Sequence, residues 1–515
     1  MALTLPSRAS HVLAGTAFFV GVSLLAALLG IVAAWFPLSF SLGLAGLLGL
    51  LVIFLMAVFL PSNVRAPGGL LGGMLAVVLV VSALWPGYVT FKYSGAPGIS
   101  PTRLVYWGMV LLWFFWLTAS PMLRRHLFAQ LGAFKGYQLL LAIYVIWQII
   151  AATVSPVPFA SFYYLVKLLF GGYLFYLIVL SVMHGAHDVQ RVIVWVVVAA
   201  AMVSLIGMLE GFRKVNLFAG LFPTDPEQLE TLQWIILDKT RSGAYRVAST
   251  FSHPLAFAEY LTMCLPLAAY LALNGQVRWH KLIGVGALPL MLVGLYLSRT
   301  RSALVVAAIV AVTLMLIVGA RATAQRKNFF HAIIGTCLIV GVLLAVVGGS
   351  GLMTELTVGR DSAERGSTNA RVDMMARGSP LVATEPIIGY GPGRAAITLG
   401  AQPGHVNISI DNYYLSVALE SGLPGLFLFA ITLAYPIALG LFRGLTHHTP
   451  AGSMALALGA GLLAFAAERG VLSLTNNLDF SIMLTAMLFV TELQIRRERK
   501  ASGASRKYKL GHATL

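Results

Sequence analysis

Charged residues are scarce in this sequence, and acidic residues are the scarcest. Asp, Glu, Lys and Arg make up 10% of its 515 residues, and Asp and Glu together number only 18. Soluble domains carry about 25% charged residues, so this composition excludes an ordinary soluble domain. Cysteine occurs twice, at Cys264 and Cys337, each inside an apolar stretch. Two such cysteines exclude a disulfide framework and a cysteine-based metal motif.

Signals for nucleotide binding are absent as well. No Gly-x-x-x-x-Gly-Lys-Ser/Thr loop occurs, and the glycine-rich segment 389–393 follows no predicted strand, so we interpret it as a tight turn. Asp225 and Glu227 flank a proline and fit a turn better than a metal site. We therefore expect no ATP use, no cofactor and no obligatory metal. The net charge is +17, but no basic stripe with interleaved aromatic residues occurs, which argues against a nucleic-acid partner.

Long apolar runs dominate the sequence instead. The hydrophobic fraction is 58%, and apolar runs of membrane-spanning length recur up to residue 495. One crossing needs about 20 apolar residues, so we predict an all-α polytopic membrane protein with about 12–14 transmembrane helices. The predicted spans are 11–31, 38–60, 69–91, 103–120, 136–154, 162–183, 190–209, 252–273, 280–297, 302–319, 330–348, 411–440, 452–467 and 478–495.

The distribution of Lys and Arg predicts the orientation. With the N-terminus inside, the short inner loops and the tail 496–515 hold many of these cations, as the positive-inside rule requires. Both termini are therefore expected to be cytoplasmic, with the basic tail facing anionic lipid headgroups. The run 11–31 has no convincing small-residue cleavage site and is interpreted as a retained span.

This topology divides the chain into six segments. They are an N-terminal bundle (1–209), a first long outer loop (210–251), central helices (252–348), a second long outer loop (349–410), C-terminal helices (411–495) and the tail (496–515). Long loops usually carry function, and we expect both to form lids over an outward-facing cavity. Each should contain a short amphipathic helix, one around 234–237 and one over 370–377, with residues 367–369 as caps and Gly378 and Pro380 as a stop.

Two outer cations stand out from the others. Arg299 and Arg301 lie in a connection of a few residues between two apolar spans, where ionisable groups are costly and commonly functional. Both could instead extend to outer headgroups. An anion site is the functional interpretation, because the guanidinium fork matches phosphate oxygens in a bidentate way.

Four segments resemble the O-antigen ligase and O-antigen polymerase superfamily, and together they cover roughly residues 205–440. They are Arg246-Val-Ala-Ser-Thr-Phe-Ser-His-Pro254, Thr300-Arg-Ser-Ala-Leu304, Glu385-Pro-Ile-Ile-Gly-Tyr-Gly-Pro-Gly393, and Asp411-Asn-Tyr-Tyr-Leu415 leading to Glu420-Ser-Gly-Leu-Pro-Gly425. The resemblance implies a GT-C-like architecture and an enzyme of the bacterial inner membrane. Such an enzyme would transfer lipid-linked glycans at the periplasmic face without a metal.

The resemblance also implies roles for particular residues. The arginines of the family motifs fall on Arg246, Arg301 and Arg371, where they would bind the pyrophosphate of a polyprenyl carrier, with Arg299 beside them. The histidine usual before the family's Asn-x-Tyr-Leu is replaced by Asp411, and His405 lies six residues upstream. An aspartate at this place is more similar to exopolysaccharide and capsule polymerases than to ligases. The implied partners are a glycan donor and acceptor, an upstream flippase and a chain-length regulator.

Glycan transfer to a sugar hydroxyl usually needs a base, and Asp411 and His405 are the leading candidates. Asp411 could also simply cap the helix that follows, and His405 could be an ordinary surface residue. Glu420 and Glu259 lie inside apolar spans, need interior partners and are predicted to be structural. His253 is predicted to shape the turn into its span.

Three functions compete on this basis. A polymerase of lipid-linked repeat units is preferred, and a ligase that attaches finished glycan to lipid A core or protein is the alternative. A transporter is disfavoured because its charged sites would lie near the midplane of paired repeats, whereas the ionisable residues here gather at the outer ends of spans.

Overall fold

The structure is a computed structural model that describes residues 66–91, 99–221, 240–241, 244–324, 362–400, 410–472, 475 and 477–512. The predicted spans 11–31, 38–60 and 330–348, and the helix expected around 234–237, lie outside the described residues. The chain forms two compact units, residues 1–66 with 90–123 and residues 67–89 with 124–515. The six topological segments are a different kind of division and stay a prediction.

The described part of the first unit contains α4 (Pro101–Ala119). Ser100 caps this helix by accepting the N–H of Arg103 at 3.2 Å, and a proline occupies the first helical position. Both features favour a helix start. The next helix, α5 (Pro121–Ala133), begins in this unit and continues into the second. It was not predicted, because its charged residues made the segment look like an inner loop.

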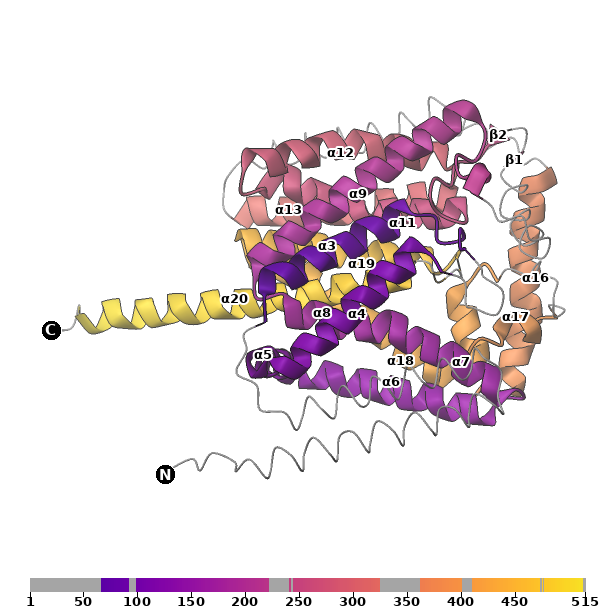
Figure 1. The fold of residues 1–515 in the computed structure, drawn as a ribbon, viewed down its shortest axis with the longest axis horizontal. Coiled ribbons are helices and arrows are strands. Elements are labelled where there is room, and N and C mark those ends of the chain that lie inside the picture. Colours follow the sequence, from indigo (N-terminus) through magenta and orange to yellow (C-terminus); the bar gives the residue numbers. More distant parts are fainter. Residues whose placement is uncertain are drawn as a thin grey trace, which may run out of the picture. The chain divides into compact units, whose positions relative to one another are not determined.

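The second unit consists of helices packed side by side, with smaller elements at one end (Figure 1). The long helices are α3 (Gly68–Leu84), α6 (Lys135–Val154), α7 (Pro158–Leu168) with the π-helical turn η1 (Leu169–Tyr173) and α8 (Leu174–Val182), α9 (Ala186–Arg213), α11 (Pro254–Asn274), α12 (Arg278–Leu297), α13 (Arg301–Ala324), α18 (Tyr413–Thr446), α19 (Pro450–Glu468) and α20 (Leu478–His512). The smaller elements are η2 (Ala219–Leu221), the antiparallel strands β1 (Thr240–Arg241) and β2 (Ala244–Tyr245), and α17 (Ala395–Thr398), beside the longer α16 (Ser362–Thr384).

The helices confirm the predicted all-α polytopic membrane protein. Within the described residues, ten helices are long and apolar enough to cross a membrane, judged by length and composition. Every predicted span that falls in these residues coincides with a helix, and the span 69–91 corresponds to the shorter apolar helix α3. The agreement is close because the bilayer thickness sets the length of each apolar run.

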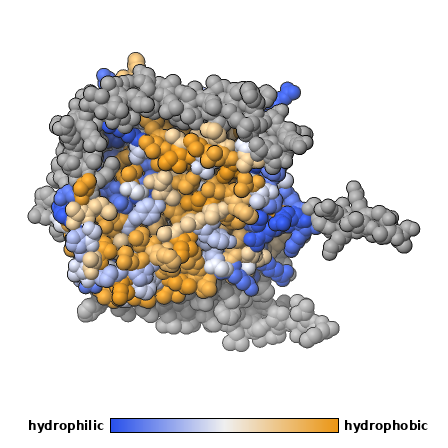
Figure 2. Space-filling model, turned by 180° about the vertical axis from the view of Figure 1, so that it is seen from behind, coloured by the Kyte–Doolittle hydropathy of each residue, from blue (hydrophilic) through white to orange (hydrophobic). Residues whose placement is uncertain are grey.

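The surfaces of these helices suit a lipid environment. Large apolar side chains such as Phe427, Leu316 and Leu282 are more than half exposed, as expected where lipid takes the place of water. Figure 2 shows a broad hydrophobic surface on one face, with hydrophilic residues gathered at the end from which α20 leaves. Between helices, small residues permit close contact: a Cβ on Gly440 of α18 would lie 2.7 Å from the Cα of Gly459 in α19.

Contacts between helix ends define two ends of the second unit. At one end the Val247 N–H donates to the Leu297 carbonyl at 3.1 Å, and the Tyr413 N–H donates to the Arg469 carbonyl at 2.8 Å. The starts of α11 and α18 therefore meet the ends of α12 and α19. We call this the Arg246 end, and in Figure 1 it lies on the right, with β1, β2, α16 and α17.

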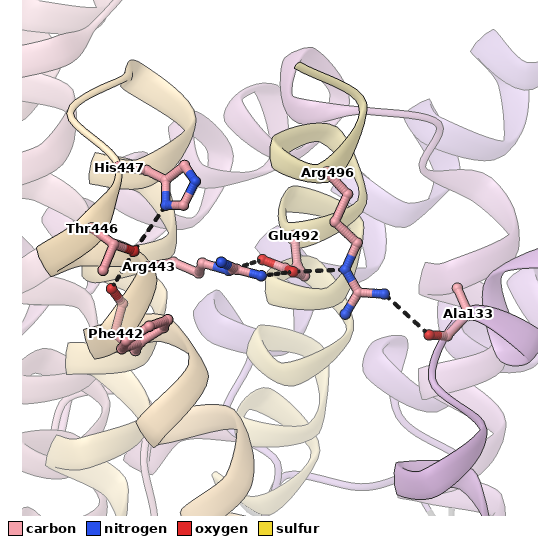
Figure 3. A network of polar contacts seen from close by, with 7 residues as sticks. All are labelled: Ala133, Phe442, Arg443, Thr446, His447, Glu492 and Arg496. Atoms are coloured by element: carbon pink, nitrogen blue, oxygen red, sulfur yellow. Dashed lines mark hydrogen bonds and ion pairs between the residues drawn. The ribbon is translucent and has the colours of Figure 1, made fainter. Parts of the chain in front are cut away.

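The opposite end is held by a buried carboxylate, and we call it the Glu492 end (Figure 3). Glu492 of α20 is fully buried and accepts hydrogen bonds from Arg443 of α18 at 2.6 and 2.5 Å, and from Arg496 at 2.7 Å. Arg496 also donates to the Ala133 carbonyl at 3.3 Å. These contacts connect α20 to α18 and to the end of α5. The candidate site lies at the opposite end, the Arg246 end.

Candidate functional site

Arg246 joins two segments that are far apart in the sequence. It lies directly after β2, and its side chain is 8% exposed. Its Nε donates to the Ser298 carbonyl at 3.4 Å, and its Nη2 donates to Thr300 Oγ1 at 3.5 Å. The structure therefore brings Arg246 to the connection between α12 and α13, where Arg299 and Arg301 lie.

This connection is tight and positively charged. Arg299 has a left-handed backbone, with φ of 49°, and its exposed side chain lies 6.0 Å from the centre of the Tyr296 ring. Arg301 is the first residue of α13 and is partly buried. The first-turn N–H groups of a long helix add partial positive charge at the same place. Three arginines and a helix start thus gather at the Arg246 end.

A buried glutamate fixes the segment that carries Arg246. Glu210 of α9 is 1% exposed, and it accepts the Tyr245 hydroxyl at 2.7 Å and the Ser249 N–H at 2.6 Å. Burial, and then the carboxylate of Glu210, raise the pKa of Tyr245, so its hydroxyl remains a donor. Thr250 Oγ1 donates to the Ala83 carbonyl at 2.6 Å. No local sequence motif predicts the role of Glu210, because its partners lie more than thirty residues away.

The segment with Asp411 starts α18, but Asp411 is not the cap. Asn412 occupies the cap position, with φ of −158° and ψ of 107°, and its side chain accepts the Leu415 N–H at 3.1 Å. The alternative in which Asp411 caps the helix is therefore wrong by one residue. Asp411 is partly buried, and its backbone N–H donates to the Met374 sulfur at 3.5 Å. Its carboxylate does not have the capping role.

Met374 belongs to α16, so this helix lies against the start of α18. Arg371 is located in α16 one turn before Met374, so a helix is present where the resemblance implied one. The expected bounds of that helix are wrong: α16 begins before residues 367–369 and continues through Gly378 and Pro380 to Thr384. Gly378 does not end the helix. It permits close contact between α16 and α18, since a Cβ there would lie 2.9 Å from a Leu415 methyl. His405 lies outside the described residues.

The glycine-rich segment 389–393 is a tight turn, as predicted. Gly389, Gly391 and Gly393 have φ of 72°, 97° and 75°, a backbone region that glycine enters without strain. The Tyr390 N–H donates to the Leu419 carbonyl at 2.8 Å, so the turn docks on α18. This hydrogen bond is possible because the regular helix of α18 is interrupted shortly after Leu419, where Gly422 has φ of 68°.

Glu420 holds this turn, which confirms its predicted structural role. Its carbonyl accepts the Gly391 N–H at 2.9 Å, and its carboxylate accepts the N–H groups of Gly393 and Ala395. His253 also has its predicted role, because it caps α11 by accepting the Leu255 N–H at 3.1 Å. Cys264 is a buried free cysteine, and Cys337 lies outside the described residues.

The structure thus places two groups at the same end of the second unit. The first contains Arg246, Arg299 and Arg301, and the second contains Asp411 beside the helix that carries Arg371. In the described part of the chain, His, Cys, Asp and Glu residues form no group of three that could hold a metal ion. Such an arrangement can bind an anion with guanidinium groups and present a carboxylate at the same end of the unit.

Comparison with known proteins agrees with these segments. Residues 286–430 match the family model described as O-Antigen ligase. The match includes Arg299, Arg301, Arg371 and Asp411, whereas Arg246 lies before it. Over 197 residues the chain is 29% identical to an O-antigen polymerase of Salmonella muenchen, an alignment that covers 37% of this chain and 46% of that protein. The chain therefore matches less than half of this curated relative's length.

Proposed function

Because this chain belongs to the O-antigen ligase and O-antigen polymerase superfamily, we propose that it polymerises glycan repeat units carried on a polyprenyl pyrophosphate. The reaction would occur at the periplasmic face of the bacterial inner membrane, with both termini in the cytoplasm. One observation supports this function most: Arg246 bonds to the connection that carries Arg299 and Arg301. This places three guanidinium groups at the end of the unit where Asp411 begins α18.

The arginines suit the leaving group of such a reaction. When the acceptor hydroxyl forms its bond to the anomeric carbon of the donor sugar, the bond from that carbon to the pyrophosphate oxygen breaks. Negative charge then grows on the pyrophosphate, and preorganised guanidinium groups stabilise it. Arg246 is held by its hydrogen bonds to Ser298 and Thr300, while the side chain of Arg299 is exposed and could contact a ligand. Arg371 would add a fourth cation from α16.

Asp411 would supply the base. As the new glycosidic bond forms, the acceptor hydroxyl loses its proton, and a carboxylate can accept it. Asn412, and not Asp411, caps α18, so helix capping is not the function of the Asp411 carboxylate. His405 is the second candidate. The chemistry of this scheme involves only side chains, the donor and the acceptor, so it requires no metal ion. A flippase would deliver the donor to the outer face, and a chain-length regulator would limit the product.

The test is the Asp411→Asn variant in the native host, with extraction of lipid-linked glycans. Asparagine is nearly the same size but accepts no proton at neutral pH, so polymer should disappear and the lipid-linked single repeat unit should accumulate. His405→Ala should have a smaller effect. Wild-type polymer at matched protein level would contradict the role of Asp411 and make His405 the leading base.

A ligase is the second candidate, because the matching family model is described as O-Antigen ligase. A ligase transfers a finished glycan from the same kind of carrier to lipid A core or protein, so the arginines would act in the same way. The extraction distinguishes the two functions. Long lipid-linked polymer in the Asp411→Asn strain would mean that elongation continues while the final transfer fails, and it would favour the ligase.

A further inference from the structure

A buried ion pair crosses the Arg246 end between two helices. Arg469, at the end of α19, and Glu259 of α11 are both 0% exposed. Arg469 Nε donates to Glu259 Oε1 at 2.9 Å, and its Nη2 donates to the same oxygen. The other oxygen, Oε2, accepts from Asn477 Nδ2 at 2.8 Å. Glu259 thus has the interior partner that its place in an apolar span required.

Arg469 also holds the start of α18 in two ways. Its carbonyl accepts the Tyr413 N–H at 2.8 Å, and its guanidinium carbon lies 5.5 Å from the centre of the Tyr413 ring. The hydroxyl of Tyr414 donates to the Ala466 carbonyl in the same helix at 2.7 Å. Tyr413 is two residues after Asp411. Arg469 therefore contacts the chain two residues after Asp411.

Glu259 connects this contact to the arginines. It lies in the second turn of α11, and α11 follows directly on the segment that begins with Arg246. The same segment is bonded to α12 through the Val247 N–H and the Leu297 carbonyl. The chain from Arg246 to Glu259, the ion pair and the contact with Tyr413 form a continuous link between the two groups of the site.

We propose that Glu259 and Arg469 are positioning residues that fix Asp411 relative to Arg246. This inference rests on the proposed function, because it concerns the placement of the base. Neither side chain is exposed, so neither touches the substrate. Stability alone is a weak reason for such a pair, since well-packed apolar residues often replace a buried ion pair without loss of stability. Fixed geometry is a better reason, because a displacement of about 1 Å can lower a rate about 100-fold.

The experiment replaces the whole pair by apolar residues of similar size, in the double variant Glu259→Leu with Arg469→Met. A matched control treats the buried pair at the opposite end, Glu492→Leu with Arg443→Met. Both proteins are purified in lipid nanodiscs and assayed with the lipid-linked repeat unit extracted from cells that lack this enzyme. We expect the first variant to stay folded, with kcat lowered about 10- to 100-fold and KM for the donor nearly unchanged. The control should keep the wild-type kcat.

Thermal denaturation of both variants separates geometry from folding. If the Glu259 and Arg469 variant keeps the wild-type kcat, or loses activity only in proportion to its folded fraction, the positioning role is refuted. An equal fall of kcat in the control would also refute it. If the double variant does not fold, Arg469→Lys replaces it: the charge remains while the contact of Nε with Glu259 is lost, and kcat should fall at unchanged KM. Wild-type kcat in folded Arg469→Lys would refute the role.

Combination with Asp411→Asn distinguishes this inference from the proposed function. If the ion pair acts through Asp411, its replacement should lower kcat little further once the carboxylate is gone, because the two changes then affect one interaction. Additive losses would refute the positioning role and leave the base in place. Wild-type activity of Asp411→Asn alone would instead refute the proposed base, whatever the ion-pair variants show.

Discussion

Replacing Asn412 by alanine should loosen the start of α18 and leave the chemistry intact, whereas replacing Asp411 by asparagine should have the opposite effect. The reason is that Asn412 caps the helix, whereas its neighbour Asp411 is the proposed base. Asn412 Oδ1 accepts the Leu415 N–H at 3.1 Å, and alanine removes this acceptor. Asp411 contacts Met374 through its backbone N–H, which asparagine retains.

The size of the first effect follows from the capping bond. Loss of an Asn cap costs about 0.5–2 kcal/mol, and we expect about 1 kcal/mol because the contacts of Tyr413 with Arg469 still hold the helix start. Such a loss makes local opening about fivefold more frequent. It is small beside a typical total stability of about 5–15 kcal/mol, so the folded fraction and the polymerisation rate should hardly change. Loss of a general base, by contrast, typically lowers a rate about 10²- to 10⁴-fold.

Hydrogen–deuterium exchange read by mass spectrometry measures the first effect locally. Peptides that cover the first turn of α18 should exchange about fivefold faster in Asn412→Ala and at the wild-type rate in Asp411→Asn. Polymerisation of the extracted lipid-linked repeat unit measures the second effect in the same preparations. If Asp411→Asn accelerates exchange as much as Asn412→Ala does, Asp411 has a structural role. If Asn412→Ala alone abolishes polymerisation, our division between cap and base is wrong.

Two further predictions concern the arginines and the orientation. Arg301→Lys should lower polymerisation about 10²- to 10³-fold at matched protein level, because lysine keeps the charge and loses the bidentate fork. Arg299→Lys, in the exposed part of the same connection, should have a milder effect. Near-normal polymer from Arg301→Lys would favour the interpretation that these side chains only extend to headgroups. Alkaline phosphatase fused after residue 230 or after residue 380 should be active, and a fusion after residue 500 should be inactive. The reason is that the distribution of Lys and Arg over the short loops predicts both long loops outside and the tail inside. An inactive fusion after residue 380 would contradict both the orientation and the periplasmic site.

The spans could be predicted from the sequence because the thickness of the bilayer sets the number of apolar residues that a spanning helix needs. The span predicted at 136–154 is the helix Lys135–Val154, and the span at 280–297 is Arg278–Leu297. Helices outside the apolar runs were harder to predict. In α16, Gly378 and Pro380 looked like a stop, but the helix continues to Thr384, and Gly378 makes room for Leu415. A glycine that ends a helix and one that permits a close helix contact look the same in a sequence.

For the candidate site, the motifs predict which residues take part but not which of two neighbours caps the helix. Asp411 and Asn412 are adjacent, and both residue types cap helices about equally well. The backbone of Asn412 decides between them, and no pattern of side chains reports it. Glu210 could not be predicted for a different reason: it fixes Tyr245 and Ser249 from 35 and 39 residues away, so no local motif contains the contact.

Arg469 shows why a count of outer cations cannot identify an anion site. Arg469 follows the predicted span 452–467 and so lies, in the predicted topology, on the same side as Arg246, Arg299 and Arg301, yet its guanidinium is 0% exposed and bound to Glu259. A substrate cannot reach it, whereas Arg299 is exposed and Arg301 is partly buried. Burial therefore separates Arg299 and Arg301, which a ligand can reach, from Arg469, which contacts only the protein. The division was invisible in the sequence because the two members of the ion pair are 210 residues apart, and only the packing of α11 against α19 brings them together.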